Sequence, residues 1–231
     1  MLDTEKSALL ETEAKQNTFI SRVYGWMSLS LLLTAIVSIY TFSNEFLLSL
    51  IFKNTFLFLG LIFGELLLVI YLRSAIERMT VQAASISLIV YAILNGLTLS
   101  VIFLLYTTAS VASTFFVTAA TFGVMSAYGY FTKEDLSRLG NMFLMGLVGV
   151  IIASVINIFL KSSLLYWLIT YAGLFVFIGL TAYDTQKIKQ LSLSVSNDQE
   201  SAKLSIIGAL TLYLDFINLF LLLLRVFGRR K

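Results

Sequence analysis

The sequence contains no cysteine, no histidine and no proline, and it has few charged residues. Without cysteine the chain has no disulfides and no thiolate metal sites. Without histidine it has no imidazole ligands, histidine-based triads or imidazole proton relays, so any proton chemistry must use carboxylates. Charged residues make up 13% of the chain and apolar residues 58%, whereas soluble domains carry about 25% charged residues. This composition excludes a water-soluble fold.

The basic residues do not form a nucleic-acid-binding surface. The formal net charge is only +3, and no basic block is interleaved with aromatic residues. A nucleic-acid binder needs such a block, so we expect no nucleic-acid partner. The small excess of Lys and Arg instead indicates the orientation of the chain in a lipid bilayer.

Long apolar stretches predict seven membrane spans, because about 20 helical residues cross the hydrocarbon core. The spans are expected at residues 23–44, 54–72, 81–106, 111–131, 139–160, 162–183 and 204–227. The apolar runs are continuous and do not alternate with a period of two, which favours helices over a β-barrel. The expected fold class is an all-α polytopic membrane protein with seven transmembrane helices.

The segments outside the spans are short and polar. Residues 1–22 are predicted to be a cytosolic amino-terminal arm, 23–228 a single transmembrane domain, 229–231 a basic tail and 190–203 a flexible cytosolic connection. No cleaved signal peptide is expected, because the first apolar run is too long. A cytosolic amino terminus places most Lys and Arg inside, as the positive-inside rule favours. The basic tail then lies outside, so a re-entrant last segment that folds back at Asp215 is an alternative.

Two aspartates in the last two spans are the main candidates for a functional site. Asp215 lies near the middle of the last span, where an ionised carboxylate costs roughly 2.5–3.5 kcal/mol, so it must face protein or water. Asp184 ends the sixth apolar run. If that helix continues to about Leu191, Asp184 lies about 10 Å inside its cytosolic end. The two acids would then meet on antiparallel helices and share one proton, which would make them a pH sensor.

The same two acids offer hard oxygen ligands of the kind that bind Ca²⁺. Two carboxylates supply too few ligands for tight binding, so we expect a weak, transient Ca²⁺ site at Asp184 and Asp215 and no resident cofactor. The structural alternatives are a protonated Asp215 hydrogen-bonded to Asn218 and an Asp184 that is an ordinary interfacial residue.

Two charged residues of the second span extend this hypothesis. Arg73 closes the span at its cytosolic end and is a candidate ion-pair partner for the acids, although a positive-inside anchor explains it equally well. Glu65 lies eight residues earlier, about 12 Å deeper along a helix. Glu65 and Asn218 are candidates to line an ion pathway, and a protonated Glu65 bonded between helices is the alternative.

Three stretches of the sequence are distinctive: FFVTAATFGVMSAYGYFTK at residues 115–133, GLTAYDTQKIK at 179–189 and IGALTLYLDFINLFLLLLRVFG at 207–228. Together they resemble the bacterial branch of the Bax inhibitor 1 family, also called the transmembrane Bax inhibitor motif family. The resemblance implies six helices around a central seventh and a pH-sensitive Ca²⁺ leak gated by an aspartate dyad. The dyad carries over to Asp184 and Asp215, its arginine partner to Arg73 and an acid of the second helix to Glu65.

The resemblance also implies a bacterial plasma (inner) membrane, a role in stress protection and, in some members, modulation of a membrane-bound protease. The preferred hypothesis is therefore a pH-sensitive Ca²⁺ leak channel that is not an enzyme and whose partners are the lipid bilayer, Ca²⁺ and protons. The first alternative is a non-transporting regulator of a membrane protease or another membrane complex.

An enzyme and a transporter are two further alternatives. An intramembrane aspartyl protease also uses two acids, but its second acid sits in a Gly-x-Gly-Asp element, whereas Tyr213 and Leu214 precede Asp215. A proton-coupled transporter is disfavoured, because the sequence shows no paired broken helices and no proline.

Overall fold

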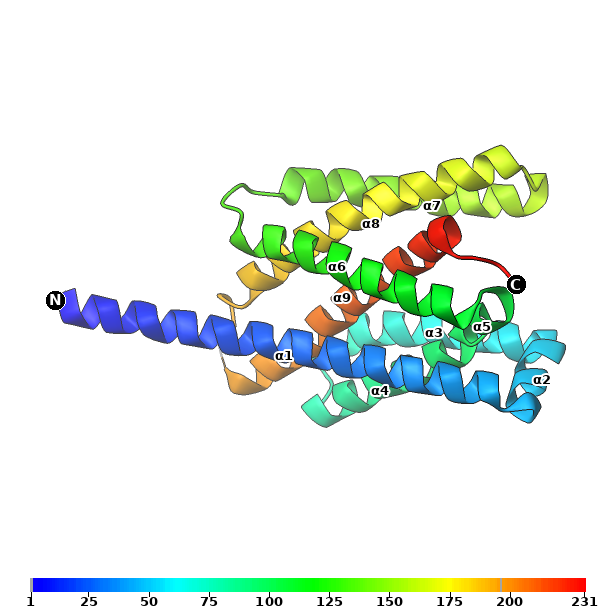
Figure 1. Cartoon of the computed structure of the whole chain (residues 1–231). Helices are drawn as coiled ribbons and strands as arrows, with labels where there is room; N and C mark the ends of the chain where they lie inside the picture. The colour runs from blue at the N-terminus through cyan, green and yellow to red at the C-terminus, as the bar shows by residue number, and fades with distance from the viewer. Residues whose placement is uncertain (1, 196) are drawn as a thin grey trace. The chain divides into compact units, whose positions relative to one another are not determined.

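The computed structural model describes residues 2–195 and 197–231, with side chains from residue 14 onward. Over these residues the chain is mostly helical (Figure 1). The helices are α1 (Leu2–Ser43), α2 (Glu45–Lys53), α3 (Thr55–Ala75), α4 (Val81–Leu99), α5 (Ile102–Leu105), α6 (Thr108–Phe131), α7 (Ser137–Leu160), α8 (Ser163–Leu191) and α9 (Asp198–Phe227). An isolated antiparallel bridge joins Tyr106 and Arg230.

Seven helical segments of the described chain are long and apolar enough to cross a bilayer. They are Ala14–Ser43, Thr55–Ala75, Val81–Leu105, Thr108–Phe131, Ser137–Leu160, Ser163–Leu191 and Asp198–Phe227. The all-α polytopic membrane fold is therefore confirmed. Of the most apolar window of α9, 72% is buried, compared with 6% for α3 and 0% for α7. Of these seven segments, α9 is therefore the most buried.

The chain divides into two compact units. Unit 1 contains Met1–Leu105 and Lys189–Tyr213, and unit 2 contains Tyr106–Ile188 and Leu214–Lys231. Helix α9 thus contributes its amino-terminal half to unit 1 and its carboxy-terminal half to unit 2. Asp184 and Asp215 both belong to unit 2, whereas Arg73 and Glu65 belong to unit 1.

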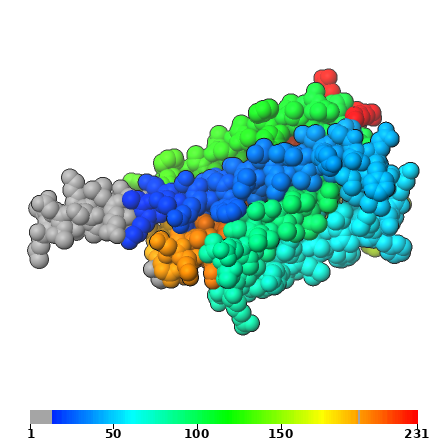
Figure 2. All heavy atoms as spheres, turned by 90° about the horizontal axis from the view of Figure 1, so that it is seen from below, coloured from blue at the N-terminus to red at the C-terminus, as the bar shows by residue number. Residues whose placement is uncertain are grey.

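In unit 1, α4 packs against both α1 and α3 (Figure 1). Figure 2 shows the side chains of α1 running alongside those of α4. Gly96 permits this approach, because a Cβ atom at this position would lie 2.8 Å from the carbonyl oxygen of Thr34. The short helix α2 joins α1 to α3. Its ends are set by Asn44 and Asn54, whose side chains cap α2 and α3 respectively.

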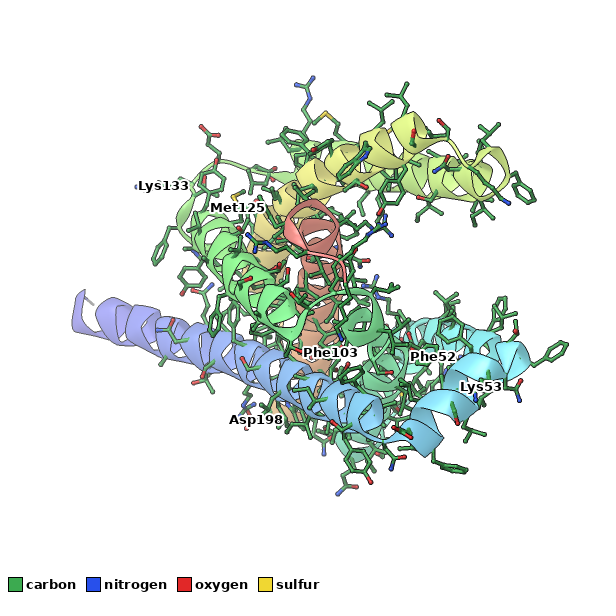
Figure 3. All side chains as sticks on the ribbon, turned by 45° about the vertical axis from the view of Figure 1, so that its right-hand side comes forward. Phe52, Lys53, Phe103, Met125, Lys133 and Asp198 are labelled. Atoms are coloured by element: carbon green, nitrogen blue, oxygen red, sulfur yellow. The ribbon has the colours of Figure 1, made fainter. Side chains whose placement is uncertain are left out.

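Helix α2 carries an aromatic and a basic residue at its carboxy-terminal end, Phe52 and Lys53, which Figure 3 labels. The ring of Phe52 lies 5.4 Å from the ring of Phe58 on α3. The sequence did not predict this helix, because Glu45–Lys53 is too short to span a membrane.

The ends of α8 and α9 test two sequence predictions. Helix α8 continues to Leu191, as the depth estimate for Asp184 required. The predicted connection at 190–203 is wrong in extent, because α9 already begins at Asp198 (labelled in Figure 3) and only residues 192–197 lie between the helices. The side chain of Asn197 accepts a hydrogen bond of 2.9 Å from the Glu200 amide, a capping interaction that starts a helix within a polar segment.

The last helix is continuous. α9 runs without interruption from Asp198 to Phe227 and passes through Asp215, so a re-entrant segment that folds back at Asp215 is wrong. Thirty helical residues rise about 45 Å, which is more than one bilayer crossing. At the other end of the chain, residues 2–22 form the first part of α1, and the cytosolic placement of this segment stays a prediction.

Candidate functional site

The segment of α8 that carries Asp184 packs closely against α6. The hydroxyl groups of Ser126 on α6 and Thr185 on α8 are 3.0 Å apart and hydrogen-bonded. One turn along α6, Gly129 lies so close to α8 that an added Cβ atom would overlap the carbonyl oxygen of Ala182. Asp184 itself is half-buried. The contacts at Ala182 and Thr185 therefore fix the backbone on either side of Asp184.

Helix α7 packs against the same segment of α8. The ring of Tyr183 occupies the space beside Gly140, where an added Cβ atom would overlap the ring. One turn earlier on α8, Gly179 leaves room for the ring of Phe143 in the same way. These glycines allow aromatic rings of one helix to pack against the backbone of the other.

Gln186 ties α8 to the connection between α6 and α7. Its Nε2 donates to the Glu134 carbonyl at 2.7 Å, and its Oε1 accepts from the Leu136 amide at 2.8 Å. Gln186 is 7% exposed. In the same connection, the hydrogen bonds from the side chain and amide of Ser137 lower the pKa of the Asp135 carboxyl. The connection is thus ordered by one amide side chain from α8.

Replacing Gln186 with alanine is expected to lower the free energy of unfolding by about 2 kcal/mol, because buried polar backbone groups lose their hydrogen-bond partners. The amide of Leu136, a residue that is 3% exposed, should exchange its proton faster in hydrogen–deuterium exchange. Gln190→Ala is the matched control, because Gln190 is exposed on the same helix. Equal stability of the two variants would show that Gln186 does not hold the connection.

Asp215 lies in the buried carboxy-terminal half of α9, where it is 5% exposed. The next residue, Phe216, packs against Phe115 and Phe122 of α6, with ring centroids 5.3 and 5.6 Å apart. Asn218 is half-buried, and its amide nitrogen donates to the Leu214 carbonyl at 2.8 Å. The pathway role of Asn218 stays a prediction.

Helices α8 and α9 pack against each other in an antiparallel direction. A Cβ atom added at Gly173 would lie 3.2 Å from the Leu222 side chain. Nearer the start of α8, the guanidinium carbon of Arg225 lies 5.5 Å from the centre of the Tyr166 ring. Later residues of α8 thus pair with earlier residues of α9, as the sequence predicted for the helices that carry the two aspartates.

The two candidate residues of α3 make hydrogen bonds within unit 1. Arg73 is exposed and donates to the Thr211 hydroxyl at 3.3 Å. Thr211 lies one turn before Asp215 on α9. The Glu65 carboxyl is half-buried and accepts hydrogen bonds from Asn95 at 3.2 Å and Thr98 at 2.8 Å. The ion-pair role of Arg73 and the pathway role of Glu65 stay predictions.

Sequence reasoning missed the partners of Glu65. Asn95 and Thr98 are separated by one helical turn in an apolar span, and that spacing is a signal for a shared polar contact. Two further residues of unit 1, Tyr213 and Thr34, continue the hydrogen-bonded chain from Asn95. They come from opposite ends of the sequence, so no local pattern identifies them.

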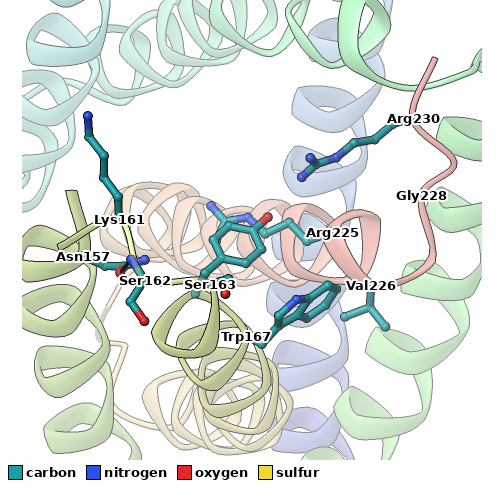
Figure 4. Close-up of a pocket in the computed structure, with 10 residues that line it drawn as sticks. Asn157, Lys161, Ser162, Ser163, Trp167, Arg225, Val226, Gly228 and Arg230 are labelled. Atoms are coloured by element: carbon teal, nitrogen blue, oxygen red, sulfur yellow. Dashed lines mark hydrogen bonds between the residues drawn. The ribbon is translucent and has the colours of Figure 1, made fainter. Parts of the chain in front are cut away.

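A cleft of about 600 Å³ in unit 2 is lined by cations and by no carboxylate. Lys161, Arg225 and Arg230 contribute the positive charges, and Trp167 also lines the cleft (Figure 4). The hydrogen bond with Tyr106 raises the pKa of the Arg230 guanidinium. The positive charges of this cleft disfavour the binding of a cation there. Among the described residues, no cluster of three or more Asp or Glu side chains is positioned to hold a metal ion.

The seven apolar helices define a polytopic α-helical membrane protein. Within that class, the chain belongs to the family described as "Inhibitor of apoptosis-promoting Bax1", which matches residues 16–231. The resemblance seen in the sequence is thereby confirmed.

The chain is similar to several bacterial proteins over nearly its whole length. It is 49% identical to "Inner membrane protein YbhL" of Escherichia coli strain K12 over 226 residues, which cover 97% of each chain. It is 45% identical over 238 aligned positions to the protein RP147 of Rickettsia prowazekii strain Madrid E, with 100% of both chains covered. A membrane protein of Streptococcus pyogenes serotype M1 is 37% identical, covering 95% of this chain and 96% of its own length.

Proposed function

We propose that this protein is a pH-sensitive Ca²⁺ leak channel in which Asp184 and Asp215 share one labile proton. The proposal assigns it a role in ion homeostasis or stress protection and no enzymatic activity. It further places the protein in a bacterial inner membrane, as the name of the Escherichia coli relative indicates for that protein, with the amino terminus in the cytosol. The packing of α8 against α9 carries the proposal.

The direction of Asp184 on α8 supports the pairing. Asp184 follows Tyr166 by eighteen residues and Gly173 by eleven. At 3.6 residues per turn, it lies within about 20° of both around the helix axis. Those two residues contact α9. Ala182, which contacts α6, points about 160° away from Asp184. This direction supports a position of Asp184 on the face of α8 that packs against α9.

The direction of Asp215 on α9 gives the same result. Asp215 precedes Leu222, which contacts Gly173 of α8, by seven residues, so the two lie within about 20° of each other around the helix axis. The neighbours that contact α6, Phe216 and Phe220, point about 100° and 140° away from Asp215. Asp215 therefore shares the face of α9 that packs against α8.

The levels of the two acids along the helices are also close. From the contact between Gly173 and Leu222, Asp184 lies about 16 Å along α8 and Asp215 about 10 Å along α9 in the same direction. The difference is about 6 Å. Helical side chains tilt toward the amino terminus of their own helix. Because α8 and α9 are antiparallel, the side chains of Asp184 and Asp215 tilt in opposite directions, which reduces the difference in level between the two carboxyls.

A shared proton would control the path as follows. Two carboxylates in a low-dielectric site cannot both be ionised at low cost, so the pair holds one proton. Loss of that proton leaves two like charges, whose repulsion shifts the last two spans between two arrangements. The freed carboxylate oxygens and the Asn218 amide oxygen then offer Ca²⁺ a transient, weak site. The proposal keeps the roles that the resemblance implies for Arg73, as an ion-pair partner of the acids, and for Glu65, as a second acidic position on the path.

The test is dye-reported Ca²⁺ flux into liposomes that contain the purified protein, measured across a pH series. We expect the native protein to give a flux that changes with pH. In Asp215→Asn, the dependence on pH should be lost, because the remaining acid has no partner with which to share a proton. Asp198→Asn, in the first turn of the same helix, should keep the native pH profile. An unchanged pH profile in Asp215→Asn would rule out the dyad.

The absence of any flux from the native protein would favour the second candidate, a regulator of a membrane protease or another membrane complex. Helices α3 and α7 leave most of their apolar surface uncovered, and such surface contacts either lipid or a partner helix. A partner that co-purifies stoichiometrically in mild detergent, together with no flux, would establish the regulator.

A further inference from the structure

A chain of hydrogen bonds runs through unit 1 from Glu65 to helix α1. The Glu65 carboxyl accepts from Asn95 Nδ2 at 3.2 Å, and Asn95 Oδ1 accepts from the Tyr213 hydroxyl at 3.1 Å. The Tyr213 hydroxyl lies 2.8 Å from the Thr34 hydroxyl. Thr34 in turn donates to the Ala92 carbonyl at 2.9 Å. The chain thus connects α3, α4, α9 and α1.

Three members of the chain are closed off from water, whereas Glu65 at its end is half-buried. Asn95 is 7% exposed, Thr34 3% and Tyr213 0%. Buried polar groups must find their hydrogen bonds among themselves, because an unmade bond leaves the full cost of desolvation. A change in the hydrogen bond between Glu65 and Asn95 must therefore be accommodated by the three buried members.

Two hydroxyl groups of this hydrogen-bonded chain have fewer protons than close polar contacts. The hydroxyl groups of Thr34 and Tyr213 carry one proton each, but they make three close contacts: with the Ala92 carbonyl, with each other and with Asn95 Oδ1. Three hydrogen bonds cannot share two protons. If the Thr34 and Tyr213 hydroxyls stay hydrogen-bonded to each other, these distances are compatible with two arrangements, one in which the protons point toward Glu65 and one in which they point toward Ala92.

We propose that Glu65 binds a single proton and that this proton reverses the whole chain. An ionised carboxylate only accepts, so Thr34 donates to Tyr213, Tyr213 to Asn95 Oδ1 and Asn95 Nδ2 to Glu65. A protonated Glu65 donates instead to Asn95 Oδ1 after the amide turns over. Asn95 Nδ2 then donates to Tyr213, Tyr213 to Thr34 and Thr34 to the Ala92 carbonyl. In each arrangement both hydroxyl protons are donated to an acceptor, and the ionised arrangement alone leaves the contact between Thr34 and the Ala92 carbonyl without a proton.

The other groups near Glu65 leave this carboxyl as the one that titrates. Tyr91 of α4 and Tyr213 of α9 interact electrostatically with Glu65, and tyrosines ordinarily titrate near pH 10. From α4 the carboxyl also meets Thr98, which does not titrate. Arg73, on the same helix as Glu65, is two turns away and donates to Thr211. The proposed proton site does not involve Asp184 or Asp215, so it stands whether or not the protein conducts Ca²⁺.

The test is infrared spectroscopy of the full-length protein in liposomes during a pH titration. A protonated Glu65 contributes a carboxylic C=O stretching band, which is assigned by its loss in Glu65→Gln. Thr34→Val removes the group that accepts from Tyr213 in the protonated arrangement only. The pH at which half of the band is present should therefore fall by about one unit, a tenfold change in proton affinity. Thr34→Ser keeps the hydroxyl and should match the native protein.

Two further variants keep the test decisive. Thr34→Ala also removes the hydroxyl but introduces no new methyl group, so it must give the same downward shift. Tyr213→Phe cuts the chain between Asn95 and Thr34, so adding Thr34→Val to it should produce no further shift. The proposal is overturned if no band depends on Glu65, if the Thr34 variants leave the midpoint unchanged or raise it, or if the shift persists in the Tyr213→Phe protein.

Discussion

Gly129→Ala is expected to lower the free energy of unfolding by about 3 kcal/mol, the upper end of the usual cost of overpacking. The added Cβ atom would overlap the backbone carbonyl of Ala182. A backbone carbonyl cannot turn aside as a flexible side chain can. Helix α8 is also held at this level by Thr185, which hydrogen-bonds to Ser126 of α6. The helices must therefore separate, and the contacts on both sides weaken.

The measurement is thermal unfolding of the detergent-solubilised protein, followed by circular dichroism. Gly123→Ala is the matched control on the same helix, because a Cβ atom added at Gly123 meets nothing within 4 Å. Alanine has the higher helix propensity, so the control should be as stable as the native protein or slightly more stable. If both variants unfold together with the native protein, α6 and α8 are not in the close contact described here.

The importance of Gly129 could not be predicted from the sequence. The stretch FFVTAATFGVMSAYGYFTK contains Gly123 and Gly129 in similar apolar surroundings, yet only Gly129 lies against another helix. Which of two glycines is needed depends on the rotation of α6 about its axis. That rotation is set by contacts with Ala182 and Thr185 of α8, which lie more than fifty positions later in the sequence than their partners on α6.

The spans were predictable because the bilayer sets their length and polarity, and all seven are present. The start of α9 was not predictable, because Asn, Asp and Ser favour both loops and helix caps. Only the bond from Asn197 to the Glu200 amide shows that this segment begins a helix. Likewise, Asn44 and Asn54 each cap a helix, but from sequence they mark only the end of one span and the start of the next.

The candidate acids also differ in how much of their surroundings the sequence predicts. Asp215 could be singled out as a candidate functional residue from the sequence alone, because a carboxyl in the middle of an apolar span has a high insertion free energy. The surroundings of Glu65 were not, since its hydrogen-bonded chain joins Asn95 to Tyr213 and Thr34 across most of the sequence. The free-energy cost of placing a charge in an apolar span can be estimated from one residue and its neighbours in sequence. The hydrogen-bond partners of that residue depend on the tertiary structure.

Asp184→Asn, Asp215→Asn and the double variant should all lose the pH dependence of Ca²⁺ flux to the same extent. One titrating proton changes a population by at most about tenfold per pH unit, and we expect each variant to reduce that ratio to about one. A shared proton exists only while both carboxyls are present. The second substitution therefore has nothing left to remove, and the effects are fully non-additive.

The measurement is the flux ratio between two pH values in liposomes, with the three variants and the native protein reconstituted at equal density. Two independent sites would behave differently, because each single variant would keep part of the pH dependence and the double variant would lose the sum. That result would separate Asp184 from Asp215 as proton sites. It would contradict the dyad even if both residues were needed for flux. Asp184 and Asp215 would then be two separate ligands on the facing sides of α8 and α9, and they would not share one proton.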